Sequence, residues 1–336
     1  MNVRVSPNLI LAAGLPIMAA VFLVAVSVGR YQISFDALVS ILSGDHSEYI
    51  TEWNVLTKLR IPRTIAAACV GVALSISGLL FQELFQNKLV SPDFLGVSEG
   101  AGVGAALAIL LGMSVTMVSI MAFAAGLLAV TATITLSKCF RTKSPLGLLM
   151  SGIVVGGMAA AFLQIIKCQA GPEATLAAIE FWLMGSCESV TPVEAVMLIG
   201  VVSVLATIIL SVKWRINMVS LGYEECRSRG VDYRKYHWLI ILVATFLTAS
   251  TVAVVGCVSW IGLVVPHIAR MVAGQNTKYS IPMAIVLGGT SVMIADVLSR
   301  SFSTAEYPLS AVTALFGTVV ILALIIVKRG KLDDRI

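Results

Sequence analysis

Long apolar stretches separated by short polar loops dominate the chain. Ten stand out, at residues 9–28, 64–81, 97–111, 117–136, 146–166, 193–212, 238–255, 260–272, 281–298 and 311–327. A helix that crosses a bilayer needs about 20 apolar residues. The pattern therefore predicts an all-α polytopic membrane protein with about ten transmembrane helices in one domain, residues 1–336.

Two of these stretches, 97–111 and 260–272, are short for a full crossing. We expect these helices either to be broken or to be flanked by re-entrant backbone, which is tolerated where protein or a water-filled cavity covers it. The first stretch exceeds the apolar core of about 7–15 residues that is typical of a signal peptide, so we expect it to be retained as a helix.

Composition supports a membrane protein, since 58% of residues are hydrophobic and 12% are charged, whereas soluble domains average about 45–50% and about 25%. A soluble enzyme, a disordered chain and a nucleic-acid binder are all disfavoured. With the N-terminus inside and ten crossings, 17 of the 23 Lys and Arg residues lie on the inner side. This bias predicts that both termini are cytoplasmic.

Three polar segments are longer than simple connections require. The outside loop 30–63 contains an amphipathic stretch, 35–42, which predicts a helix lying in the membrane interface. The inside loop 213–237 contains a helix-forming segment, 221–230, punctuated by glycines. It indicates either a cytosolic partner or an ordinary solvated loop. Outside, residues 174–184 predict a short helix over a cavity mouth, and a Cys168–Cys187 bridge in the same segment remains open.

Candidate chemistry is sparse. The chain has no GxxxxGK[ST] loop, no catalytic set and no Cys/His cluster, so we expect no enzymatic activity and no cofactor or metal site in it. Glycines spaced four apart (Gly96, Gly100 and Gly104; Gly152 and Gly156) predict flat surfaces for helix packing.

The few charges near the apolar stretches are more informative. Asp296 and Arg300 lie four apart on one helix face and are predicted to pair. Arg60 and Arg63 flank Pro62 at the mouth of the second stretch, where a short turn is expected to fix their spacing. These three arginines lie outside against the charge bias, which predicts a site for carboxylates of an external partner. Anchoring to lipid phosphates is the alternative.

Several motifs resemble one known family, the FecCD-type permease subunits of ABC importers, which carry ferric siderophores, haem or cobalamin. The matching segments occur in family order at 60–64 (RIPRT), 78–87 (GLLFQELFQN), 95–102 (LGVSEGAG), 182–185 (WLMG), 262–270 (GLVVPHIAR), 295–296 (AD), 306–308 (EYP) and 313–317 (TALFG). Together they cover most of the chain.

This resemblance implies ten helices in each of two permease subunits, identical or paralogous, with the path at their interface. Two cytosolic subunits bind ATP and Mg²⁺ and contact the coupling segment, here Leu221, Gly222, Glu224, Glu225, Cys226 and Gly230. An extracytoplasmic solute-binding protein docks on the positions occupied here by Arg60, Arg63 and Arg300. The location implied is the prokaryotic cytoplasmic (inner) membrane, with lipid as a further partner and no nucleic acid.

The resemblance also places the inner gate at Asn87, Leu89, Pro145 and Leu146. We predict a pathway lined by small, weakly polar residues, namely Ser151, Gly156, Thr313 and Gly317. The widest use of the family makes a ferric siderophore or related iron chelate the expected cargo, with haem and cobalamin as alternatives. A stand-alone secondary transporter is the rival of another class.

Overall fold

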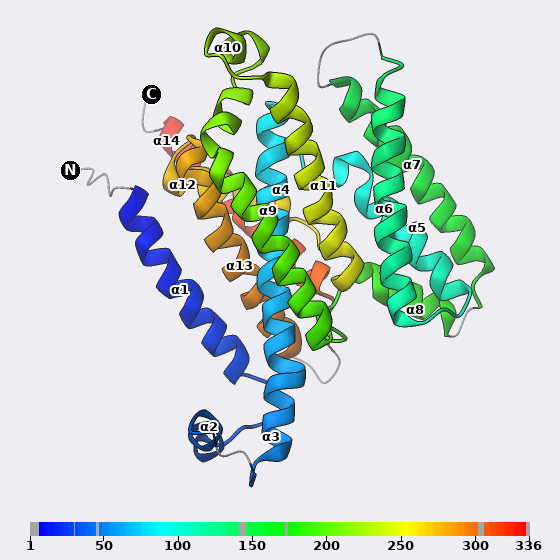
Figure 1. The fold of residues 1–336 in the computed structure, drawn as a ribbon, viewed down its shortest axis with the longest axis vertical. Helices are drawn as coiled ribbons and strands as arrows, with labels where there is room; N and C mark the ends of the chain where they lie inside the picture. The colour runs from blue at the N-terminus through cyan, green and yellow to red at the C-terminus, as the bar shows by residue number, and fades with distance from the viewer. Residues whose placement is uncertain are drawn as a thin grey trace.

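The computed structural model describes residues 7–29, 31–44, 47–140, 146–171, 174–301 and 306–333, and these residues form helices joined by short loops (Figure 1). Each of the ten apolar stretches corresponds to a helix. These helices are α1 (Pro7–Ser27), α4 (Ile61–Leu84), α5 (Val97–Leu110), α6 (Val115–Ser137), α7 (Leu146–Gln169), α9 (Pro192–Val219), α11 (Tyr233–Val255), α12 (Ile261–Ala273), α13 (Thr277–Ser301) and α14 (Leu309–Asp333).

Seven helices in the described part of the chain are long and apolar enough to cross a membrane. The helices α5 and α12 are short, as predicted, with 14 and 13 residues. A polytopic helical membrane protein is therefore confirmed, while the number of crossings and the side of the termini stay predictions.

The broken-helix prediction is confirmed by the backbone that precedes α5 and α12. Before α5 the chain forms a 3-10 turn, η2 (Pro92–Leu95), and the carbonyl of Leu95 accepts a hydrogen bond from Thr133 Oγ1 at 3.0 Å. Before α12, the carbonyl of Val255 accepts from the backbone N–H of Ser186 at 2.8 Å. These internal partners replace the water that backbone groups lack inside a membrane.

The predicted outside loop 30–63 is only partly a loop. The amphipathic stretch forms α2 (Phe35–Leu42), with its N-terminus capped by Ser34. However, α3 (Ile50–Asn54) and a π-helix, η1 (Val55–Arg60), run without a break into α4. The prediction of a turn around Pro62 was wrong, because the chain stays helical through this residue, from Ile50 to Leu84. The π-helix η1, whose hydrogen bonds join residues five apart instead of four, lies directly before the α-helical segment that contains Pro62.

The central helix is α4, which is buried along almost its whole length between α9, α11, α12 and α13. Glycines make this possible. A Cβ on Gly71 would lie 2.0 Å from the carbonyl oxygen of Gly288, and one on Gly78 would lie 1.8 Å from that of Gly262. Because small residues let helix backbones approach closely in a membrane, α4 contacts α13 and α12 at backbone distance.

The predicted glycine surfaces on α5 and α7 are confirmed for three positions. Gly100 and Gly104 face the backbone of α6, and Gly152 faces the carbonyl oxygen of Phe94, which a Cβ would approach to 1.9 Å. Gly96 has a different role, since its φ of +77° places it in the left-handed turn between η2 and α5.

The segment after α7 contains the predicted short helix, α8 (Thr175–Met184). Cys168 lies exposed at the end of α7, whereas Cys187 is buried, and both thiols are free. The bridge considered from the sequence is therefore not formed in this structure.

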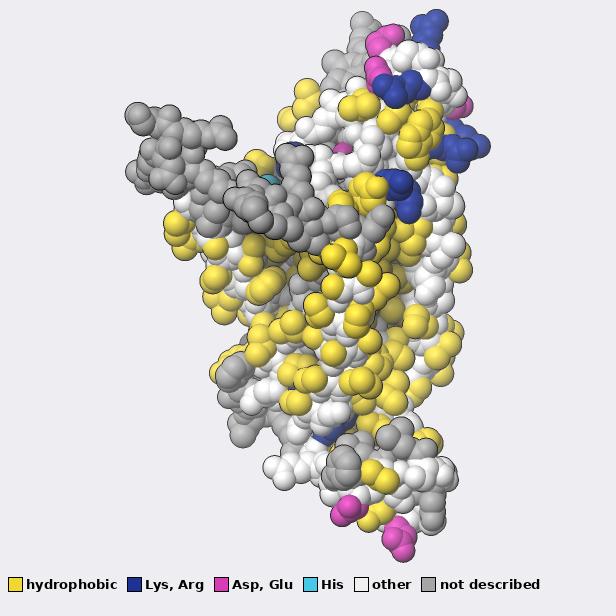
Figure 2. Space-filling model, turned by 90° about the vertical axis from the view of Figure 1, so that its left-hand side faces the viewer, with side chains coloured by type: hydrophobic (Ala, Val, Ile, Leu, Met, Phe, Trp, Pro, Cys, Tyr) yellow, Lys and Arg dark blue, Asp and Glu magenta, His cyan; other side chains and the backbone are white. Residues whose placement is uncertain are grey.

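The surface agrees with a membrane setting. Figure 2 shows a broad band of apolar side chains, with most of the visible Lys and Arg, interspersed with Asp and Glu, at the end that carries α10 (Tyr223–Ser228), and further acidic side chains at the opposite end. The described ends of α1 and α14 also point toward the α10 end in Figure 1. A basic end next to an apolar band is typical of the cytoplasmic side.

Candidate functional site

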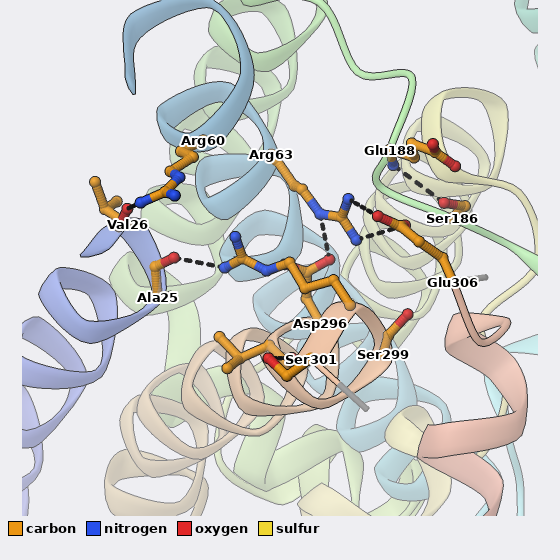
Figure 3. A network of polar contacts seen from close by, with 12 residues as sticks. Ala25, Val26, Arg60, Arg63, Ser186, Glu188, Asp296, Ser299, Ser301 and Glu306 are labelled. Atoms are coloured by element: carbon orange, nitrogen blue, oxygen red, sulfur yellow. Dashed lines mark hydrogen bonds and ion pairs between the residues drawn. The ribbon is translucent and has the colours of Figure 1, made fainter. Parts of the chain in front are cut away.

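A network of buried charges lies at the end of the bundle opposite α10 (Figure 3). At its centre, Arg63 on α4 donates to both oxygens of Glu306, from Nη1 at 2.8 Å and Nη2 at 2.9 Å. Its Nε donates to Asp296 Oδ1 on α13 at 2.8 Å. Such a two-point contact between a guanidinium group and a carboxylate is both strong and directional, so it fixes α4 against α13 and the segment before α14.

Asp296 is shared between two arginines. Besides Arg63, the Nε of Arg300 lies 3.3 Å from Asp296 Oδ2, one turn along the same helix. The pairing of Asp296 with Arg300 expected from their spacing is thus confirmed.

The end of α1 is held by the same arginines. Arg300 Nη2 donates to the carbonyl of Ala25, and Arg60 Nη1 donates to the carbonyls of Val26, at 3.1 Å, and Ser27, at 2.6 Å. The last carbonyls of a helix lack intrahelical partners, and cations near them interact favourably with the helix dipole. The two guanidinium groups therefore cap α1 and tie it to α4 and α13.

The arginines predicted for docking are consequently not exposed. Arg60, Arg63 and Arg300 are 5%, 9% and 6% exposed, and their donors are used within the chain. An exposed position for these arginines, as a docking surface implies, is not found in this conformation. Spacing along the sequence predicted only the contact of Arg300 with Asp296, whereas the other partners lie far away along the chain. The docking role stays a prediction. It would require these arginines to exchange their present partners within the chain for carboxylates of the solute-binding protein.

At the other end of the bundle, the coupling segment folds as a short helix, α10, bounded by two glycines with positive φ, +100° at Gly222 and +69° at Gly230. This confirms the helix expected within 221–230. Cys226 is buried and anchors α10, and burial raises the pKa of its thiol, which therefore packs as an apolar group.

The rest of α10 faces outward. Leu221, Tyr223 and Glu224 are exposed, and Glu225 accepts from Arg229 Nε at 2.6 Å along the surface. These exposed residues form a small polar and aromatic surface at the end of the bundle where most of the visible Lys and Arg lie (Figure 2). Its role in ATPase coupling stays a prediction.

The predicted gate residues are separated into two places. Asn87 and Leu89 form the turn after α4, where Asn87 Oδ1 accepts from the backbone N–H of Leu89 at 3.0 Å. Leu146 is exposed at the start of α7, and Pro145 lies outside the described residues.

The predicted pathway residues also differ in their surroundings. Gly156 lines a cavity between α7 and α5, whereas Gly317 packs against the ring of Trp260. Ser151 and Thr313 are fully buried and donate to carbonyls of their own helices, Gly147 at 2.8 Å and Ser310 at 3.1 Å. Their contribution to a pathway stays a prediction.

Sequence reasoning missed two carboxylates. Glu306 belongs to a quoted motif, but its contact with Arg63 spans 243 residues. Glu83 pairs with Arg270 Nη1 at 3.1 Å, and Arg270 also donates to Gln82. The sequence did contain a clue in each case. A charged residue next to an apolar stretch of a membrane protein is costly without a partner, so a partner for Glu306 and for Glu83 could have been sought.

Comparisons with known proteins identify the family. The profile of the FecCD transport family matches residues 17–327. The molybdate import system permease protein MolB of Haemophilus influenzae is 32% identical over 93% of this chain and 94% of its own length. The Fe(3+)-citrate import system permease protein YfmE of Bacillus subtilis is 33% identical over 90% of each chain.

A solved structure shows the same fold. It represents the inward-facing conformation of a transporter assigned to the metal-chelate ABC type, with a TM-score of 0.86, 30% identity, and coverage of 95% of this chain and 99% of that one. Permeases of this family imply separate ATP-binding subunits and a partner permease. The chain therefore belongs to the FecCD transport family and is a multi-pass inner-membrane permease subunit of an ABC importer.

Proposed function

We propose that this permease subunit imports a ferric siderophore or related iron chelate by alternating access between two permease subunits. Two cytosolic ATP-binding subunits supply the energy, and an extracytoplasmic solute-binding protein delivers the cargo. The relative for Fe(3+)-citrate and the metal-chelate transporter structure support a chelated metal as cargo. Haem, cobalamin and molybdate are the alternatives within the family.

The observation that carries the coupling part of this proposal is α10. A polar helix of six residues, held by buried Cys226 and exposed on its outer face, projects at the basic end of the bundle. We place Leu221, Gly222, Glu224, Glu225, Cys226 and Gly230 at the contact with an ATP-binding subunit. Motion of that subunit then reaches α9 and α11, which α10 connects.

The transport path is proposed to run between two permease subunits, lined by α7 and α14 with α8 near its outer mouth. We assign Ser151, Gly156, Thr313 and Gly317 to the path, and Asn87, Leu89, Pro145 and Leu146 to its inner gate. The exposed start of α7 and the exposed turn at Leu89 support an inner gate that opens to the cytosol.

Changing Gly230 to Trp tests this function. Gly230 has a φ of +69° and open space around it, so a Trp strains the backbone locally and places a large ring on the coupling surface. We expect uptake of ferric chelate by vesicles containing the complete transporter to fall at least tenfold, with the melting temperature of the permease nearly unchanged.

Gly274→Trp is a matched control, because Gly274 also has a positive φ, +91°, with open space around it, but lies outside the coupling segment. We expect this control to retain transport. Normal ATP-driven uptake by the Gly230→Trp variant would refute the assignment of α10.

Docking of the solute-binding protein at Arg60, Arg63 and Arg300 is the second part of the proposal. Within the described network three arginines face two carboxylates, Asp296 and Glu306, which leaves one positive charge in excess. A carboxylate of an external protein would balance it, and such encounters are steered over about 8–10 Å and slowed by salt.

For this docking site we expect Arg60→Gln to weaken binding of the solute-binding protein by about 2–5 kcal/mol, the cost of removing one partner of a buried charge pair. Lys58→Gln, on an exposed residue two positions earlier in the same helix, should change affinity little. Binding would be measured in nanodiscs at low and high salt. If the Arg60→Gln and Lys58→Gln variants bind the solute-binding protein equally tightly at low salt, the docking role is refuted and the arginines only stabilise the fold.

A further inference from the structure

A cavity of about 360 Å³ opens between α7 and the start of α5, away from the two sites described above. Its lining residues include Asp93 and Glu99 from one side and Gly152, Gly156 and Gly157 of α7 from the other. Gly156 is the eleventh of the 24 residues of α7. At 1.5 Å per residue this places it about 15 Å from one end of the helix and about 20 Å from the other, so the cavity lies at the middle of a membrane-spanning helix.

The two carboxylates differ in their surroundings. Asp93 is held in place, since its two oxygens accept hydrogen bonds from Ser91 Oγ, at 2.8 Å, and from Ser98 Oγ. Glu99 Oε2, in contrast, is buried and has no hydrogen-bond partner among the described residues. Among the described residues that line this cavity there is no Lys or Arg.

The glycines of α7 keep the space beside Glu99 open. Gly152 packs directly on the carbonyl of Phe94 and so fixes α7 against the turn before α5. One turn further, the position of a Cβ on Gly156 would be 3.9 Å from Glu99 Cδ, and a Cβ on Gly157 would meet nothing within 4 Å. A larger side chain at either position would occupy the region that Glu99 borders.

A carboxylate without a basic partner is costly in the middle of a membrane unless water or a cation reaches it. Here Asp93 and Glu99 both line one opening, so water or a cation that enters the cavity comes close to two acidic side chains. The cavity therefore has to be hydrated, with a negative potential that attracts cations and repels anions.

We propose that Asp93 and Glu99 form a charge-selective wall of the transport path that favours cargo with positive or hydrogen-bond-donating groups and disfavours oxyanions such as molybdate. The inference rests on the proposed path along α7, because only a path there brings cargo to this wall. Glu99 is the specificity-determining residue, and Asp93 supports it from a fixed position. In a pair of identical subunits, each copy contributes one such wall.

Thiol labelling tests the potential without any cargo. Ile153, which lines the same cavity and is exposed, is changed to Cys in a background with Cys139→Ser, Cys168→Ser and Cys257→Ser, which leaves only the buried Cys69, Cys187 and Cys226. The assembled transporter in nanodiscs is then treated with a cationic and an anionic methanethiosulfonate of similar size. Each rate is divided by the rate of the same reagent with a free thiol, which corrects for the different reactivities of the two reagents. The pKa of the new thiol cancels in the ratio of the two rates because both reagents attack the same thiolate.

We expect the cationic reagent to react about tenfold faster than the anionic one, since a potential slightly above one kT changes their local concentrations in opposite directions. Glu99→Gln should lower this ratio to about threefold, whereas Glu180→Gln, on a half-exposed side chain of α8 that pairs with Lys167, should leave it unchanged. No reaction with either reagent, equal rates, or a ratio that Glu99→Gln does not alter would overturn the proposal. The result is independent of the proposed cargo, since no cargo is present.

A transport measurement then tests selection. Vesicles containing the complete transporter take up a cationic ferric trihydroxamate and anionic ferric citrate in competition. We expect Glu99→Gln to raise the uptake of the anionic chelate relative to the cationic one at least threefold. An unchanged ratio would overturn the specificity role of Glu99, whereas failure of the parent transporter to take up either chelate would refute the proposed cargo instead.

Discussion

Replacing Gly78 with Ala is expected to destabilise the folded protein strongly. The added Cβ would lie 1.8 Å from the carbonyl oxygen of Gly262, and neither backbone can yield by rotating a side chain. The helices α4 and α12 would have to separate by more than 1 Å, and α4 contacts most of the core. Overpacking usually lowers the free energy of unfolding by about 1–3 kcal/mol. For Gly78→Ala we expect a decrease at or above the upper end of this range, measured by reversible unfolding in detergent.

Gly200→Ala provides the control for this experiment, because Gly200 lies on an exposed face of α9 and a Cβ there meets nothing within 4 Å. That change should leave stability equal or slightly higher, since Ala favours helices over Gly by about 1 kcal/mol. A Gly78→Ala variant as stable as the Gly200→Ala variant would show that the close approach of α4 and α12 is not required.

The second large effect is expected for Asp296→Leu. This change leaves Arg63 with Glu306 alone and removes the carboxylate that Arg300 faces. Removal of one member of a buried ion pair costs about 3–5 kcal/mol, so we expect a destabilisation of that size in the same unfolding measurement.

Two further variants separate charge pairing from packing. Asp296→Leu combined with Arg300→Met should be more stable than Asp296→Leu alone, because it removes the unpaired cation as well. Glu180→Gln, which breaks the 3.0 Å contact with Lys167 on a half-exposed side chain, should cost less than about 1 kcal/mol. Destabilisation by Asp296→Leu no greater than that by Glu180→Gln would contradict a stabilising role for the network.

Helices were predictable from the sequence because each is encoded locally. The apolar stretch 35–42 coincides with α2, and the stretch 97–111 with α5 to within a residue. Ends were less certain where polar residues continue a helix, as at α11, which begins at Tyr233 instead of 238. An N-cap at Asp232 accounts for the earlier start, since its side chain accepts from the backbone N–H of Lys235.

The candidate site was predictable only where its partners are close in sequence. Asp296 and Arg300 are four apart, and helical spacing alone brings them together. Arg63 and Glu306 meet only because α4, α13 and the segment before α14 pack against one another. The arginines that the sequence predicted as an outside docking surface are therefore found in the fold as parts of a buried network.

The capping of α1 by Arg60 and Arg300 has a consequence for assembly in the membrane. The carbonyl of Ala25 and its donor Arg300 are 275 residues apart, a distance that a ribosome covers in about 15–55 s at about 5–20 residues per second. During that interval the end of α1 can be capped by Arg60 but not yet by Arg300. The contact from Arg300 can form only after α13 has been synthesised, so complete capping of α1 requires a nearly completed chain, and a chain truncated before α13 would lack this attachment of its first helix.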